Sequence, residues 1–315
     1  MLDVLATARP DIVALQGLDY DLDGLVLTAL AERLRARDLD YPHLFALRPN
    51  TGLRTGLDLD GDGRTGGPGD AQGFGFFAGQ GGMAILSRFP VVTSDLRDFS
   101  ALLWRDLPGA TLPEKDGQPF PSPEAQAVQR LSTTGHWDVP VQVGDAVLHL
   151  LTFHASPPVF DGPEDANGLR NRDELRLWSL YLDGALPGAP PPDGRFIVLG
   201  DANLDPEDGD GRSAAMAAFL ADPRLTDPLP SSRGGMAASA AQGAINARQK
   251  GDPALDTADW PEADGPGNLR VDYVLPSADL KVTGAGVLWP ADGPLAETVA
   301  TASRHRLVWV DIALP

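Results

Sequence analysis

The chain has 315 residues, of which 43% are hydrophobic and 22% are charged, and it contains no cysteine. This composition is that of an ordinary globular protein, and it excludes wholesale disorder, a disulfide framework, a thiol nucleophile and a cysteine-ligated zinc site. The formal net charge of -19 disfavours attraction to a nucleic-acid backbone, although acidity that only aids solubility is the alternative.

No stretch of the sequence approaches the ~20 apolar residues of a membrane span, and residues 1–10 lack the basic start and apolar centre of a secretory signal. We therefore expect a soluble protein. It is either cytoplasmic or exported, with any leader absent from this sequence. The sequence makes no prediction about the oligomeric state.

The first half of the chain begins with a strand and a helix. The apolar run 11–16 is typical of a buried strand, and residues 25–37 have apolar side chains at helical spacing. Residues 48–82 are rich in Gly and Asp and have no periodicity, and a loop of this length is usually functional or stabilised by metal. A short strand is predicted at 83–86, and the five prolines of 107–125 indicate a surface excursion.

Strand signals return in the middle of the chain. The runs 137–143 and 146–153 are separated by Gly144 and Asp145, which predicts a hairpin. Residues 171–182 have the apolar spacing of a helix, with Leu175, Trp178 and Leu182 on one face.

The last third of the chain alternates again between apolar runs and other segments. A buried strand is predicted at 195–199, a helix at 213–221 and two final strands at 271–275 and 307–312. Between them, residues 233–267 are dominated by small residues, Gly and Asp, which predicts a long loop. Together the elements indicate one α/β domain over residues 1–315, with mixed sheets packed face to face, outer helices and loop insertions at about 48–82, 107–125 and 233–267.

Polar residues stand where several predicted strands end. Asp201 and Asn203 follow a buried strand two residues apart, so both side chains can project to the same side, and Gly200 allows close backbone approach. A carboxylate at this place can accept a proton from water, and an amide can orient that water. The same Gly-Asp-Ala-Asn sequence is also suited to a turn or a helix cap, and this alternative stays open.

Two histidines also lie where a strand meets a loop. His154 ends one predicted strand, and His305 shortly precedes another. An imidazole at such a place can donate to an anionic oxygen or hold a proton near neutral pH, although each histidine could also be structural. Asp272 lies on a strand where its carboxylate could orient an imidazole, and a salt bridge with Arg270 is the alternative.

Six short motifs follow one another along the chain. They are Asp-Ile-Val-Ala-Leu-Gln (11–16), Gly-Met-Ala-Ile-Leu-Ser-Arg-Phe-Pro (82–90), Leu-Thr-Phe-His-Ala-Ser (151–156), Gly-Asp-Ala-Asn (200–203), Arg-Val-Asp-Tyr-Val-Leu (270–275) and Ser-Arg-His-Arg-Leu-Val (303–308). In these motifs and their order the chain resembles, over nearly its whole length, the endonuclease/exonuclease/phosphatase superfamily, which includes DNase I-like nucleases and inositol-phosphate phosphatases. Segments 48–82 and 157–165 resemble an uncharacterised bacterial branch that is usually exported.

The resemblance implies a four-layer α-β-β-α sandwich and a site that hydrolyses phosphoesters with a divalent metal, Mg²⁺ or Mn²⁺. By the same resemblance Asp201 is the general base, and Asn203 orients water and phosphate. His154 and His305 donate to phosphate oxygens, and Asp272 holds His305.

The sequence also departs from the family pattern at the metal-binding positions. Gly17 stands where the family has a metal-binding Glu, and Arg304 stands where it has an Asp. The opening strand that ends in an Asn ligand in the family is expected to be missing. We therefore predict a weakened metal site, in which Asp19 could supply a replacement ligand and Arg304 could neutralise phosphate directly.

A second metal site is predicted in the long Gly- and Asp-rich loop. Asp58, Asp60 and Asp62 followed by Gly63 match the first half of a calcium loop, in which alternate carboxylates converge before a sharp turn. The twelfth loop position holds Gly69 in place of the usual Glu. A structural Ca²⁺ site at 58–63 is one interpretation, and a solvated acidic loop is the other.

The leading hypothesis from the sequence is a metal-dependent phosphoesterase, either a phosphodiesterase or a phosphatase, that acts on small or locally presented phosphoesters. Nucleic acid is disfavoured as a substrate by the charge. The alternative is a catalytically degenerate, calcium-stabilised module that binds phosphate, because a fold does not guarantee activity. A glycoside hydrolase is a more distant third hypothesis, since no paired-carboxylate motif supports it.

Overall fold

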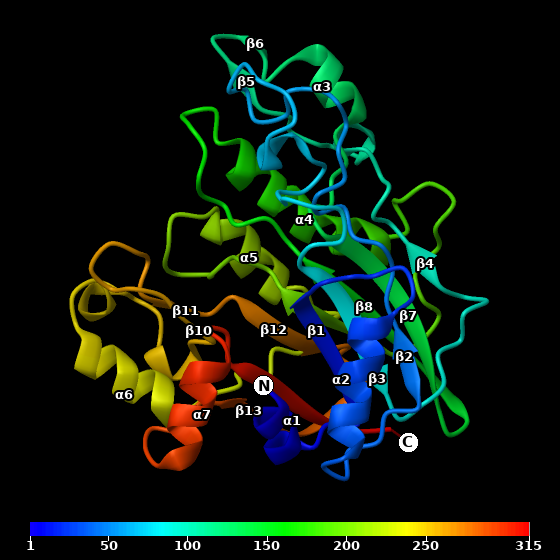
Figure 1. The fold of residues 1–315 in the computed structure, drawn as a ribbon, viewed down its shortest axis with the longest axis vertical. Helices are drawn as coiled ribbons and strands as arrows, with labels where there is room; N and C mark the ends of the chain where they lie inside the picture. The colour runs from blue at the N-terminus through cyan, green and yellow to red at the C-terminus, as the bar shows by residue number, and fades with distance from the viewer. Residues whose placement is uncertain (315) are drawn as a thin grey trace.

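The computed structural model describes residues 1–314, and Figure 1 shows the arrangement of its helices and strands. The α-helices are α1 (Leu2–Ala8), α2 (Leu25–Arg35), α3 (Pro123–Val128), α4 (Ala166–Leu182), α5 (Ser213–Leu220), α6 (Arg233–Gln242) and α7 (Pro294–Ala302). The longer strands are β1 (Ile12–Leu18), β3 (Gly82–Ser87), β7 (Gly135–Val143), β8 (Ala146–His154), β9 (Phe196–Asp201), β12 (Asp272–Pro276), β13 (Lys281–Leu288) and β14 (Leu307–Ala313). The short strands are β2 (His43–Phe45), β4 (Arg97–Asp98), β5 (Glu114–Lys115), β6 (Gln118–Pro119), β10 (Ala258–Asp259) and β11 (Asn268–Leu269).

Two sheets form the centre of the molecule. The smaller sheet has the antiparallel order β1-β3-β2, and the larger has the order β12-β9-β8-β7-β4. Within the larger sheet β8 and β9 are parallel, whereas β9 pairs antiparallel with β12, and β7 pairs antiparallel with β8 and with β4. β13 and β14 form a separate antiparallel ribbon.

The two sheets pack against each other through apolar side chains on their inner faces. Met83 and Ile85 of β3 belong to one buried cluster with Trp137 and Val139 of β7 and Leu150 of β8. Successive side chains of a strand point to opposite faces, so each central strand needs a second apolar set for its outer face. This explains why all six residues of β3 are buried and why its sequence reads as a continuous apolar run.

Helices cover the outer face of each sheet. Leu30 and Leu34 of α2 pack in a cluster with Leu86 of β3 on one side of the molecule. On the other side, Trp178 of α4 belongs to a cluster with Phe153 of β8, and Figure 1 shows α4 and α5 on that side. The predicted α/β class, in which sheets lie between outer helices, is therefore confirmed.

The end of the chain contains elements that the sequence patterns did not predict. The segment 233–267, predicted to be a loop, begins with α6, and residues 281–302 contain β13 and α7. Helix α6 lacks apolar periodicity because its sequence is mainly Gly, Ala and Ser, but the Ser232 side chain caps it by accepting the Gly235 N–H. At Gly234 a Cβ atom would lie 2.2 Å from the Trp289 carbonyl oxygen, so the missing side chain permits this close packing.

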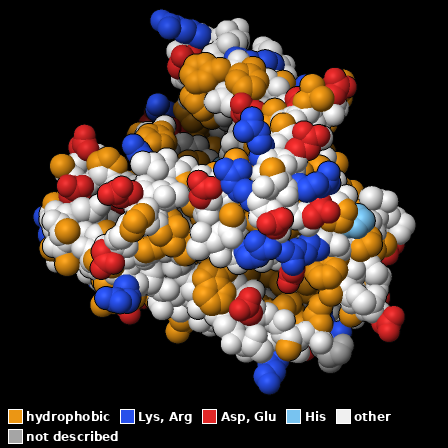
Figure 2. All heavy atoms as spheres, turned by 60° about the horizontal axis from the view of Figure 1, so that its bottom comes forward, with side chains coloured by type: hydrophobic (Ala, Val, Ile, Leu, Met, Phe, Trp, Pro, Cys, Tyr) orange, Lys and Arg blue, Asp and Glu red, His pale blue; other side chains and the backbone are white. Residues whose placement is uncertain are grey.

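None of the helices within residues 1–314 is both long enough and apolar enough to cross a lipid bilayer. Figure 2 shows one face of the molecule, on which Lys and Arg side chains are interspersed with Asp and Glu. No continuous basic patch is visible on that face.

Candidate functional site

Three strands of the larger sheet bring the predicted site residues to one edge. His154 is the last residue of β8 and Asp201 is the last residue of β9, and these two residues are paired in the parallel register of the two strands. Asp272 begins β12 and is paired with Asp201 in the antiparallel register. His305 joins this edge through an isolated bridge to Ala258.

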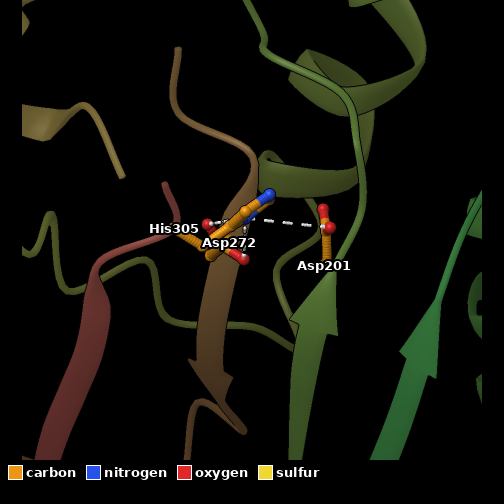
Figure 3. A group of neighbouring side chains, drawn as sticks. All are labelled: Asp201, Asp272 and His305. Carbon is orange, nitrogen blue, oxygen red and sulfur yellow. Dashed lines mark hydrogen bonds and ion pairs between the residues drawn. The ribbon is translucent and has the colours of Figure 1, made fainter. Parts of the chain in front are cut away.

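The side chains of these four residues converge, as Figure 3 shows for three of them. The His305 Nδ1 atom lies 3.0 Å from Asp272 Oδ2 and 3.9 Å from Asp201 Oδ2. The His154 Nε2 atom lies 3.4 Å from Asp201 Oδ2. His154 is on β8 and Asp272 is on β12, and these strands flank β9, which carries Asp201, on its two sides. One ligand atom each from Asp201, Asp272 and His305 lies within 4.8 Å of the other two, so this group could hold a metal ion.

Asn203 fixes the carboxylate of Asp201. Its backbone N–H donates to Asp201 Oδ1 at 2.8 Å, and its side-chain Nδ2 lies 3.3 Å from Asp201 Oδ2. The same Nδ2 donates to the Ala155 carbonyl at 2.9 Å, which ties this turn to the segment that follows His154. Asn203 has a φ of 48°, a left-handed conformation that Asn adopts more readily than most residues.

Thr257 supports the Asp272–His305 pair and was not identified from the sequence. Its hydroxyl group donates to Asp272 Oδ2 at 2.9 Å and accepts the backbone N–H groups of Val271 and Asp272, both at 3.0 Å. The Trp260 and His305 rings also meet edge to face, with their centroids 5.3 Å apart. Both residues lie in the segment 233–267, where no periodicity or motif drew attention to them.

Helix α4 holds the backbone around the site from behind. The buried Asn171 side chain donates to the carbonyl groups of Ser156 and Ala202, both at 2.7 Å. The buried Glu174 carboxylate accepts the N–H groups of Ser156 at 2.6 Å and Thr133 at 2.7 Å. These polar residues were not recognised, because in the sequence they are indistinguishable from the solvated face of an amphipathic helix.

Burial and neighbouring charges shift the pKa values of the two histidines in opposite directions. Burial disfavours the charged form of His305, but attraction to Asp272 and Asp201 outweighs it and raises the pKa of His305 to about 9. Burial, together with repulsion from His305, lowers the pKa of His154 to about 4. Burial and the neighbouring Asp272 raise the pKa of Asp201 above its usual value. At neutral pH the site therefore combines a cationic imidazole with a neutral one.

None of the positions that depart from the family pattern belongs to the group Asp201, Asp272 and His305 that could hold a metal. Gly17 has a φ of 76°, and a Cβ atom placed there would have no neighbour within 4 Å, so there is space where the resemblance places a Glu. The Asp19 Oδ1 atom accepts the Gly81 N–H at 2.8 Å, and Asp19 is not part of the group that could hold a metal. Arg304 is exposed beside His305.

The acidic loop contains a second group that could hold a cation. Carboxylate oxygens of Asp58, Asp60 and Asp70 lie within 4.8 Å of one another. Asp62, the third residue singled out in the sequence, is not in this group, and its Oδ1 atom accepts the Arg64 N–H. Asp70 was not singled out, because it comes from the far end of the loop and only folding brings it beside Asp58.

A model of the endonuclease/exonuclease/phosphatase family matches residues 1–305 of the chain. No curated protein sequence matches the chain significantly. The family assignment therefore rests on this match over nearly the whole length.

Among solved structures, the chain is similar to the endonuclease/exonuclease/phosphatase of Beutenbergia cavernae DSM 12333, with a TM-score of 0.56 and 18% identity. This match covers 99% of the chain but only 65% of the Beutenbergia protein, so the chain spans less than two thirds of that relative. A family protein from Leptotrichia buccalis C-1013-b has a TM-score of 0.54 and 14% identity, with 99% of this chain and 91% of that chain covered. The mannosyl-6-phosphatase of Bacteroides thetaiotaomicron has a TM-score of 0.48 and 14% identity, with coverage of 99% and 89%. By the family model that matches residues 1–305, the chain belongs to the endonuclease/exonuclease/phosphatase family.

Proposed function

We propose that this protein is a metal-dependent phosphoester hydrolase whose site is formed by Asp201, Asn203, His154, His305 and Asp272. The observation that carries the proposal is the convergence of two carboxylates and two imidazoles from three strand ends and a loop, with Asp201 in contact with both histidine rings. Hydrolysis of a phosphoester needs a proton acceptor for the attacking water and donors for the phosphate oxygens, and this set supplies both.

Each side chain has a distinct part in the proposed reaction. Asp201 accepts the proton of the water whose oxygen attacks phosphorus, while Asn203 holds the carboxylate in place. The cationic His305, oriented by Asp272, and His154 face the developing charge on the phosphate oxygens. The phosphorus–oxygen bond to the leaving group then breaks, and the leaving oxygen takes up a proton. Arg304 at the exposed rim adds a further positive charge toward an incoming phosphate.

The residues of the site fit a divalent cation, although without the Glu that the family uses. Asp201 and Asp272 would hold the ion with oxygen atoms. Carboxylate oxygens suit both Mg²⁺ and Mn²⁺. A bound cation would neutralise the charge of the phosphate and make the attacking water more acidic. Because Gly17 contributes no ligand, we expect weaker binding than a site with a Glu would give.

Asp19 is the remaining candidate for a replacement ligand at the end of β1. Its Oδ1 atom is engaged by the Gly81 N–H, which leaves one carboxylate oxygen for a cation. If Asp19 contributes, Asp19→Ala should lower the Mn²⁺ affinity measured by calorimetry. Unchanged affinity would remove Asp19 from the proposed site.

The alternative function is a calcium-stabilised module that binds phosphate without hydrolysing phosphoesters. Gly17 favours this alternative, because it has no side chain to bind a metal and the space around it is empty. The group formed by Asp58, Asp60 and Asp70 also favours it, because calcium there would stabilise the fold without taking part in chemistry.

Hydrolysis of bis(p-nitrophenyl) phosphate and of inositol phosphates, each with Mn²⁺ or Mg²⁺, separates the two functions. If the protein is a hydrolase, turnover should depend on the metal and should fall by about 100-fold or more in Asp201→Asn and in His154→Ala. This is the usual range for the loss of a group that transfers a proton. Asp145→Asn, at the exposed β7–β8 turn, is the matched carboxylate control and should keep full activity. Phosphate binding without turnover in the wild-type protein would instead establish the binding module.

A further inference from the structure

An open groove lies between α4 and α5, which Figure 1 shows beside each other. Its volume is about 430 Å³, within the range of about 300–1,000 Å³ that is usual for sites of small molecules. None of the residues that line the groove belongs to the candidate site described above. The groove is therefore a separate feature of the molecule.

Small side chains on α5 leave this space open. Ala214, Ala215 and Ala218 line the groove from α5, and each contributes a single methyl group where a longer side chain would fill the space. Leu175 of α4 and Phe219 of α5 complete the apolar lining, and both belong to the same buried cluster. An apolar ligand in the groove would therefore be withdrawn from water against a fixed apolar surface.

Three arginine side chains line the same groove. Arg172 and Arg176 lie four residues apart on α4, so they share the face of the helix that carries Leu175. Arg212 directly precedes α5. The other polar residue of the lining is Ser179, and no Asp or Glu lines the groove. In a chain with 44 acidic and 25 basic residues, this lining is locally cationic.

Hydrogen bonds hold the three guanidinium groups in place without matching all of their charge. The buried Asp173 accepts from Arg172 Nη2 at 2.8 Å and from Arg176 Nη1 at 2.7 Å. Asp165 accepts from Arg212 Nε at 2.9 Å. Two carboxylates thus face three guanidinium groups, which leaves an excess of one positive charge. Because the side chains are already fixed, an anion would lose less of its binding energy to ordering them.

Two of the guanidinium groups also retain free donors. Within residues 1–314, Arg172 and Arg212 each donate through Nε and Nη2, and neither donates through Nη1. The side chains remain 20% exposed for Arg172 and 42% exposed for Arg212. Guanidinium N–H groups form strong hydrogen bonds with carboxylate and phosphate oxygens, so these donors suit an anionic ligand.

We propose that the groove between α4 and α5 binds an amphiphile that has one apolar chain and an anionic head, either a carboxylate or a phosphate. The chain lies along the alanines of α5 and above Leu175 and Phe219. The head meets Arg172 and Arg212. This binding site goes beyond the proposed hydrolysis and does not depend on it.

The lining selects this ligand over others. A cationic amphiphile or a basic peptide would meet three guanidinium groups and no carboxylate in the lining. A small inorganic anion would leave the apolar part of the lining uncovered. A stable protein interface buries about 1,200–2,000 Å² of surface, whereas this groove has the size of a single small molecule.

Isothermal titration calorimetry with decanoate and with decyl phosphate, each below its micelle concentration, tests the proposal. We expect at least one of the two to bind at a single site. Acetate has the charge without the chain, and decyltrimethylammonium has the chain with the opposite charge, so neither should bind measurably. Failure of both anionic probes to bind, or equal binding of the cationic one, would overturn the proposal.

Two variants test the two parts of the groove separately. Arg212→Gln should weaken binding of the anionic probe by about tenfold or more, because it removes a charged hydrogen-bond donor. Arg35→Gln removes an exposed arginine that is likewise paired with an aspartate, Asp40, and should keep the affinity. Ala218→Trp should abolish binding by filling the groove, whereas Ala217→Trp changes an exposed alanine of α5 outside the lining and should not.

The same variants keep the proposal separate from the proposed function. Ala218→Trp should retain the wild-type melting temperature and full turnover of a soluble phosphodiester. Unchanged affinity in Arg212→Gln or in Ala218→Trp would contradict the assignment of the groove. Sedimentation velocity that shows a dimer lost in Ala218→Trp would replace the amphiphile with a second copy of the chain.

Discussion

The Asp272–His305 pair shows how neighbouring carboxylates set the protonation state of a histidine in the candidate site. The imidazole is partly buried, which opposes its charge, yet the carboxylates of Asp272 and Asp201 keep it cationic at neutral pH. Thr257 contributes by fixing the orientation of Asp272, since its hydroxyl bonds both the carboxylate and the backbone of that residue. We propose that Thr257 is a positioning residue, because its hydroxyl bonds Asp272.

Replacing Thr257 with Val removes this hydroxyl while keeping the shape of the side chain. We expect kcat to fall by about tenfold with little change in KM, since one hydrogen bond to a charged group contributes about 1.5–3 kcal/mol. Steady-state kinetics with an aryl phosphodiester measures this split. Thr283→Val on the exposed strand β13 is the control and should behave as wild type. An equal fall in both variants, or a change in KM alone, would contradict the positioning role.

Helix α4 shows how one element serves both the core and the site. Its apolar side chains, among them Leu175 and Trp178, pack on the larger sheet, while Asn171 and Glu174 bond the backbone behind the site. Burial raises the pKa of Glu174 from 4.5 to about 7, against the opposing attraction of Arg170 and the hydrogen bonds from Ser156 and Thr133. The helix therefore carries a titrating group inside the core.

The raised pKa of Glu174 makes stability depend on pH. Below pH 4.5 the group is protonated in both states, and between pH 4.5 and about 7 only the folded protein keeps the proton. Its contribution to the free energy of unfolding is thus fully present below 4.5 and is lost as the pH rises through about 7, with a size of about 3 kcal/mol. Between pH 4.5 and about 7, the free energy of unfolding measured with urea should fall less for Glu174→Gln than for wild type. If the free energy of unfolding depended on pH equally in both proteins, Glu174 would not titrate in the folded protein.

At the scale of elements, the sequence predicted the strands and their polar ends better than the helices. Apolar runs such as residues 83–86 can be recognised because both faces of a central strand are buried, and Asp201 is conspicuous because a charged residue ends such a run. Helix α6 escaped prediction because close backbone packing at Gly234 and a Ser232 cap define it, and neither leaves a periodic pattern. Contacts between distant segments, such as Thr257 with Asp272, have no signature in local spacing.

At the scale of the whole molecule, the long irregular segment between β2 and β3 contains the second group of carboxylates that could hold a cation. Asp58, Asp60 and Asp70 repel one another when ionised, and burial with neighbouring charges raises the pKa of Asp60. A bound Ca²⁺ would offset this repulsion and link the two ends of the loop. We propose that the 1–315 chain is one domain, so stabilising this loop should stabilise the whole molecule.

Calcium should therefore raise the melting temperature of the protein in a single cooperative transition. At about a hundredfold excess over the dissociation constant, binding adds about 2.7 kcal/mol, which corresponds to about 4 °C for a chain of this size. Differential scanning calorimetry with Ca²⁺ or EDTA measures the shift. Asp58→Asn should abolish it, whereas Asp62→Asn, which changes a residue of the same loop outside the group, should retain it. Loss of the shift in both variants, or in neither, would contradict the assignment.

The fate of the oxygen atom of water tests the central claim most directly. If water attacks phosphorus under Asp201, hydrolysis of a phosphodiester in H₂¹⁸O with Mn²⁺ should place ¹⁸O in the phosphate-bearing product and none in the released alcohol. Asp201→Asn should reduce this incorporation in step with the loss of turnover. Appearance of ¹⁸O in the alcohol, or incorporation into the phosphate product that does not depend on Asp201, would contradict the account of this site.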